Sequence, residues 1–184
     1  MTKNILQYFC SADDKSPVLE KPVLIGGRII ATDRRVMISI PPEKLEGYQV
    51  GEFVEPSAEL SRRILKILAA PMGPKAFDMP VIPDCPSCRA SGLSCCPICA
   101  STIVCPDCLG TKMDATTAPL DVGGRLLHTF YAVRLLLLPG PLRFFPPQPP
   151  SPAKPIPFTF GEGIGCVMSL RPEDIDCVMP WRPA

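Results

Sequence analysis

The chain has 184 residues, of which 46% are hydrophobic, and its 19 basic and 18 acidic residues leave a net charge of +1. This length fits one medium domain, or one domain carrying a small insertion, and the apolar fraction is sufficient for a hydrophobic core. The balanced charge excludes whole-chain electrostatic attraction to nucleic acid, to a membrane surface or to an acidic substrate, so any such binding needs a local patch.

The amino-terminal residues 1–10 contain no long apolar stretch, which predicts that the chain has no secretory signal. The longest apolar run, Tyr131 to Leu138, is interrupted by Arg134 and falls well short of the ~20 residues that cross a bilayer. We therefore expect a cytoplasmic protein without a membrane partner. In that reducing compartment, closely spaced cysteines favour metal binding over disulfides.

The first predicted elements are strands. Residues 23–25 and 28–32 flank Gly26-Gly27, a pair that tolerates the positive φ angles of a tight hairpin turn. Asp33-Arg34 forms the next predicted turn, and residues 36–40 alternate with strand periodicity. The sequence therefore predicts a three-stranded meander over residues 23–40.

A helix is predicted from Ser57, a residue type that caps helices, to Ala70, just before a proline. Its apolar residues recur at helical spacing, and three basic residues lie mostly away from them: Arg62, Arg63 and Lys66. A solvated helix face is the first interpretation of these cations. Contact with nucleic-acid phosphates is the alternative.

The carboxy-terminal half predicts a second helix over residues 128–138, with almost no polar face, so that it is buried or covered by a partner. A buried strand is the alternative for part of it. Residues 139–157 are rich in proline and predict a stiff extended loop, although 146–149 also fit the spacing that aromatic-lined grooves bind. Residues 158–160 and 164–170 follow as strands.

Seven of the ten cysteines lie in one short segment: Cys85, Cys88, Cys95, Cys96, Cys99, Cys105 and Cys108. Six of them form three CxxC pairs, with proline after each first cysteine. One pair supplies two thiolates, so two pairs complete the tetrahedral site of a structural zinc ion. We therefore predict a zinc cofactor with these candidate ligands: Cys85, Cys88, Cys96, Cys99, Cys105 and Cys108.

Two other uses of the cysteines are less favoured. A catalytic zinc ion keeps an open position and often uses histidine, but the chain has only His128, well beyond the cysteines. A lone CPxC pair can be a redox dithiol. Three such pairs without a surrounding βαβ pattern favour a closed zinc site instead.

The number of zinc ions stays open at this point. One ion held by the outer pairs, Cys85/Cys88 and Cys105/Cys108, is the first choice, and adjacent pairs could close a site over shorter loops. Two ions would need an eighth thiolate or a shared cysteine, for which Cys95 is available. The remaining cysteines are predicted to be buried free thiols: Cys10, Cys166 and Cys177.

The segments Cys85–Gly92 and Cys105–Thr111 resemble the CxxCxGxG repeats of the DnaJ-type chaperone cysteine-rich domain. The resemblance is partial, because this chain has three pairs rather than four and the middle pair lacks the glycines. It implies a zinc-binding, cysteine-rich hairpin. No His-Pro-Asp motif of a J-domain occurs, so a co-chaperone role is not implied.

A second resemblance concerns the remainder of the chain. Residues 26–33 are similar to a hairpin of bacterial DNA polymerase sliding clamps (beta clamps), and the helix over 57–70 follows at a suitable distance. Residues 164–170 and 179–182 resemble the closing strands and the terminal Met-Pro-x-Arg of a clamp. The resemblance implies one clamp-like domain whose basic helix corresponds to the DNA-lining helices. With its CxxC-rich insertion, the chain resembles uncharacterised phage and bacterial proteins that combine such hairpins with an insertion of this kind.

The sequence thus predicts an α+β fold with antiparallel sheets, two helices and an inserted zinc-binding hairpin. Residues 1–80 and 112–184 are assigned to the α+β domain, and 81–111 to the insertion. We expect a non-catalytic, zinc-stabilised binding or regulatory protein of a phage-encoded kind, which acts on DNA-metabolism or host-defence machinery through protein–protein contacts. The alternatives are a nucleic-acid-binding protein, which uses the basic helix and the zinc knuckles, and a thiol–disulfide oxidoreductase.

Overall fold

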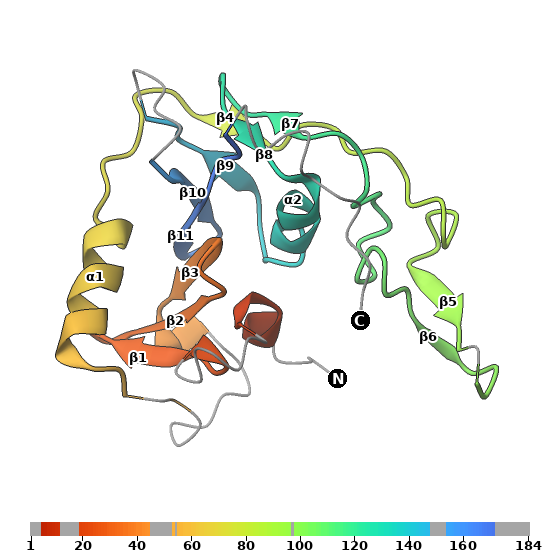
Figure 1. The fold of residues 1–184 in the computed structure, drawn as a ribbon, viewed down its shortest axis with the longest axis horizontal. Helices are drawn as coiled ribbons and strands as arrows, with labels where there is room; N and C mark the ends of the chain where they lie inside the picture. The colour runs from red at the N-terminus through yellow and green to blue at the C-terminus, as the bar shows by residue number, and fades with distance from the viewer. Residues whose placement is uncertain are drawn as a thin grey trace.

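One antiparallel sheet organises the chain in the computed structural model, which describes residues 5–11, 19–44, 53, 55–96, 98–147 and 154–171 (Figure 1). Its strand order is β1-β2-β3-β11-β10-β9-β4. The strands are β1 (Val23–Ile25), β2 (Arg28–Thr32), β3 (Val36–Ile40), β4 (Phe77–Asp78), β9 (Leu142–Phe144), β10 (Ile156–Phe160) and β11 (Gly163–Val167). Cys177 and residues 179–182, for which predictions were made, lie outside the described residues.

The predicted meander is present in β1, β2 and β3. Gly26 and Gly27 have φ angles of 58° and 72°, as the tight turn between β1 and β2 requires. Asp33 makes the next turn, where its Oδ1 accepts hydrogen bonds from the backbone N–H of Arg35 (2.9 Å) and of Val36 (2.8 Å). The hairpin β10–β11 then adds β11 beside β3, with Val167 opposite Val36.

Both faces of the sheet are covered. Helix α1 (Ala58–Leu68) packs on one face, where Ile64 contacts an apolar cluster of strand residues: Val23, Ile25, Ile30, Met37 and Cys166. The predicted cap is present, since Ser57 Oγ accepts a hydrogen bond from Leu60 N–H (3.2 Å). The opposite face carries the larger core, together with helix α2 (Thr129–Leu135) and the 3-10 helix η1 (Ile5–Phe9). This explains why every residue of β3 is buried.

Two segments differ in detail from the predictions. Helix α2 is shorter than predicted, and His128 is its N-cap, with Nδ1 accepting from Phe130 N–H (3.2 Å). The proline-rich stretch contains strand β9, because Leu142–Phe144 is a proline-free interval long enough to pair with β10 and β4. The α+β class, with two helices and antiparallel sheets in the described part of the chain, is confirmed.

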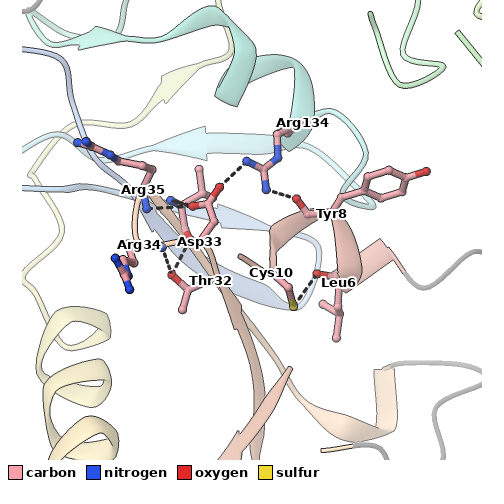
Figure 2. A network of polar contacts seen from close by, with 9 residues as sticks. Leu6, Tyr8, Cys10, Thr32, Asp33, Arg34, Arg35 and Arg134 are labelled. Atoms are coloured by element: carbon pink, nitrogen blue, oxygen red, sulfur yellow. Dashed lines mark hydrogen bonds and ion pairs between the residues drawn. The ribbon is translucent and has the colours of Figure 1, made fainter. Parts of the chain in front are cut away.

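A buried ion pair connects three elements of the larger core (Figure 2). Arg134 of α2 places Nη1 2.5 Å from Asp33 Oδ2 in the β2–β3 turn, and its Nη2 donates to the carbonyl oxygen of Tyr8 in η1. The guanidinium also lies 5.3 Å from the ring centroids of Phe9 and Phe130. Arg134, which interrupts an apolar run in the sequence, thus holds α2, η1 and the turn together.

Two short ribbons lie outside the main sheet. Strands β5 (Leu93–Cys95) and β6 (Thr102–Val104) pair with each other, as do β7 (Leu120–Asp121) and β8 (Leu126–Leu127). The β5–β6 ribbon projects at the end of the molecule farthest from α1 (Figure 1). Within the described residues, no helix has both the length and the apolarity of a membrane span.

Gly165, in the middle of β11, is expected to tolerate no side chain. A Cβ at this position would lie 2.5 Å from the backbone oxygen of Met37 and 2.4 Å from the Phe158 ring. We expect Gly165→Ala to lower the free energy of unfolding by about 1–3 kcal/mol, the usual cost of an overpacked core. Urea denaturation measures this change. Thr159→Ala on the adjacent strand is the control, and an equally stable Gly165→Ala variant would contradict the close packing of β11.

Candidate metal centre

Four cysteines come together at the base of the excursion that carries the β5–β6 ribbon, next to the bridge between Asp84 and Met113. The sulfur atoms of Cys85, Cys88, Cys105 and Cys108, here called the four-cysteine cluster, all lie within 4.8 Å of one another. Their residues are 1%, 8%, 0% and 0% exposed, respectively. The structure therefore joins the outer pairs, as the first choice from the sequence had them, into a group that could hold a metal ion.

The distances suit a tetrahedral thiolate site. Sulfurs about 2.3 Å from a central zinc ion form a tetrahedron with edges of about 3.8 Å. The Cys88 and Cys108 sulfurs are 3.7 Å apart. A cluster of four buried thiols, with no carboxylate or imidazole in the group, matches the donor set of closed structural zinc sites.

The two halves of the cluster have the same backbone conformation. We call them knuckle 1 (residues 85–92) and knuckle 2 (residues 105–112). Three positions after the second cysteine have positive φ in both, and most are not glycine. The matched pairs are Arg89 and Leu109 (49° and 54°), Ala90 and Gly110 (59° and 82°), and Gly92 and Lys112 (76° and 72°). A left-handed conformation is unfavourable for residues with a Cβ, so its repetition indicates that the cluster requires this turn.

The knuckles are also joined reciprocally. Cys105 N–H donates to the Gly92 carbonyl (3.0 Å), and Cys85 N–H donates to the Lys112 carbonyl (2.7 Å). The carbonyl oxygen of the last residue in each knuckle thus accepts a hydrogen bond from the first cysteine of the other knuckle. This exchange relates the two knuckles by an approximate two-fold rotation. Gly92 is needed at this crossing, because a Cβ there would lie 2.9 Å from the Gly110 carbonyl oxygen.

The surroundings of the thiols set their proton affinities. Burial raises the pKa of Cys108 to about 12, and it raises the pKa of Cys85 as well. Burial acts in the same direction on Cys88, but a backbone hydrogen bond from Gly92 (3.3 Å) and contacts with the neighbouring thiols outweigh it and lower the pKa to about 7. A cation bound among these sulfurs would replace the protons that burial retains on Cys85 and Cys108.

The middle CxxC pair does not join the four-cysteine cluster. Cys96 and Cys99 lie at the tip of the β5–β6 ribbon, where Cys99 is exposed and Cys96 is half-buried. Cys95, the thiol available for a bridged two-metal site, is exposed on β5 and is also outside the cluster. Cys10 is half-buried and Cys166 is buried, and burial raises the pKa of each thiol to about 12.

The predicted basic patch is on α1, away from the four-cysteine cluster (Figure 1). Arg62, Arg63 and Lys66 are exposed, and Arg63 pairs with Glu59 at 2.6 Å. Helix α1 and the β5–β6 ribbon lie at opposite ends of the molecule (Figure 1). The basic helix and the knuckles, which the nucleic-acid hypothesis combined, therefore do not form one continuous surface.

Comparison of the chain with protein-family models, with curated proteins and with solved structures finds no match. The resemblances to sliding clamps and to the DnaJ-type cysteine-rich domain therefore stay predictions. The four-cysteine cluster is the feature of the structure that indicates a class of protein.

Proposed function

We propose that the protein is a non-catalytic binding or regulatory protein whose four-cysteine cluster holds a structural zinc ion. The observation that carries the proposal is the burial of all four thiols in two reciprocally bonded knuckles. Four protein sulfurs fill a tetrahedral shell, so a zinc ion held there has no open position for a substrate or an activated water. The ion would act by fixing the fold of residues 85–112.

The proposed partners are proteins, and the sliding-clamp resemblance directs the proposal to DNA-metabolism or host-defence machinery. The zinc-bound knuckles would support this role by presenting the β5–β6 ribbon at the end of the molecule (Figure 1). Exposed apolar side chains of this ribbon and its tip supply contact area: Leu93, Ile98, Ile103 and Val104.

X-ray absorption at the zinc edge tests the metal part of the proposal on protein purified without added metal. We expect a shell of four sulfur ligands at about 2.3 Å. A shell that includes oxygen or exchangeable water would indicate a catalytic or incidental site and would overturn the proposal. The binding part is tested by reconstituting a complex between this protein and each purified candidate partner, with Leu93→Ser/Val104→Ser as the surface variant.

Nucleic-acid binding remains a second candidate because Arg62 and Lys66 are exposed four residues apart, on one side of α1. Within the described part of the chain, neither forms an ion pair. If this side contacts phosphates, affinity for DNA should fall steeply as salt rises, and Arg62→Glu/Lys66→Glu should abolish it. Glu43→Gln is a surface control on a different element. Absence of binding at low salt would exclude this candidate.

A further inference from the structure

The tip pair, Cys96 and Cys99, shares with the metal knuckles the left-handed residue directly after the second cysteine. Ala100, directly after the second cysteine, has a φ of 56°, and Arg89 and Leu109 at the same position of the knuckles have 49° and 54°. All three carry a Cβ and are strained in this conformation. The structure therefore repeats at the tip the first left-handed position of the turn that brings two thiols together in each knuckle.

The tip is ordered by its own hydrogen bonds. Ala100 N–H donates to the Cys96 carbonyl (2.9 Å), and Cys96 N–H donates to the Ser101 carbonyl (2.8 Å). Cys99 Sγ lies 3.0 Å from Ser101 Oγ. The tip thus carries two thiols three residues apart, with Cys99 exposed and Cys96 half-buried.

Two thiols are only half of a tetrahedral site. Among the described residues, the four-cysteine cluster is the only group of three or more potential ligands within reach of one ion. Cys95 is close in sequence, but its sulfur lies 3.8 Å from the Cys96 carbonyl oxygen and joins no such group. Within the described residues a metal ion at the tip thus has two thiol ligands, and another molecule can supply the remaining two.

A second copy of this chain fits that requirement. Residues 93–104 contain no charged side chain, so two copies meeting tip to tip would bring no like charges together. The tip also exposes an apolar side chain that a symmetric contact would cover, since Ile98 is 94% exposed. Two tips together supply four thiolates, the same donor set as the four-cysteine cluster.

We propose that the tip pair binds one zinc ion jointly with the tip pair of a second copy, and that this shared ion links two chains into a dimer. Binding releases the protons of the participating thiols and oxidises nothing. In this symmetric dimer, the two main domains would lie on opposite sides of the shared zinc ion.

The test measures zinc content and molar mass together, on protein kept in a phosphine reductant. We expect wild-type protein to bind about 1.5 zinc ions per chain, one in each four-cysteine cluster and one shared by two tips, and to have a dimer's mass. Cys96→Ser/Cys99→Ser should bind about one zinc ion per chain and be monomeric, with an unchanged melting temperature. Cys95→Ser, which removes an adjacent exposed thiol, should behave as wild type.

Several results would overturn the proposal. They are a wild-type monomer at saturating zinc, a double variant that still forms the dimer, and a dimer that survives chelation. Two zinc ions per wild-type monomer would also overturn it, since the tip would then complete a site within one chain. Zinc content separates this proposal from the proposed function. A wild-type monomer with about one zinc ion per chain would overturn only the dimer, whereas a Cys96→Ser/Cys99→Ser variant that binds no zinc ion would overturn the structural zinc site.

Discussion

Replacing Cys105 by serine is expected to remove zinc from the four-cysteine cluster and to unfold both knuckles. Cys105 is fully buried, and its N–H bonds to knuckle 1, so the substitution removes a ligand at the point where the knuckles join. Apparent zinc-binding energies in small zinc domains reach about 10–16 kcal/mol and are coupled to folding. Residues 85–112 form no large apolar core of their own that could replace this energy, since their buried cluster consists of the four cysteines.

Zinc analysis and limited proteolysis measure the effect. We expect Cys105→Ser to lose about one zinc ion per chain and to become cleavable between residues 85 and 112. The seven-stranded sheet should retain its cooperative unfolding, because its two apolar clusters share no residue with the four-cysteine cluster. Cys10→Ser is the control, since this half-buried thiol lies outside the four-cysteine cluster. A melting curve that chelator leaves unchanged would contradict zinc stabilisation.

The second large effect is expected at Asp33, where Asp33→Asn should lower the free energy of unfolding by about 3 kcal/mol. The Arg134 and Asp33 side chains are only 7% and 15% exposed, so removing the carboxylate charge leaves a buried guanidinium uncompensated. Asparagine retains an oxygen that can accept from Arg35 and Val36 N–H, which separates the loss of charge from the loss of the turn. Urea denaturation measures the difference.

The chain contains a matched exposed pair for comparison. Arg63 and Glu59 are 74% and 69% exposed at a similar separation of 2.6 Å, so Glu59→Gln should cost only about 0.5 kcal/mol or less. A second test combines Asp33→Asn with Arg134→Met. Because a buried pair can be replaced by apolar groups at little cost, the double variant should recover part of the lost stability. Equal losses for Asp33→Asn and Glu59→Gln would contradict the role of the buried pair.

The elements that were predicted from the sequence are those fixed by local chemistry. The Gly26-Gly27 turn, the alternation of residues 36–40 and the Ser57 cap are each decided by a few adjacent residues, and all three are present. The strand order is decided elsewhere, because β11 joins β3 across most of the chain length. Periodicity contains no information on which distant strand becomes the neighbour, so the single seven-stranded sheet could not be derived.

The candidate site divides in the same way. CxxC spacing identified the cysteines, but only three-dimensional contact shows that the outer pairs meet and that the middle pair is left at the tip. The left-handed backbone conformation of the knuckles could not be predicted, because Arg89 and Leu109 are not residue types that favour a positive φ. Arg134 did leave a signal, as a lone cation in an apolar helix, although its partner Asp33 is far away in sequence.

The outermost strands of the sheet restrict how copies of this protein can associate. Strands β1 and β4, at the two edges, have three and two residues, respectively. An edge this short offers few unpaired N–H and C=O groups to an incoming strand, which protects a sheet from edge-to-edge aggregation. A growing, open-ended β-assembly is therefore disfavoured. Any association that does occur is therefore expected to form a closed oligomer with a defined number of chains.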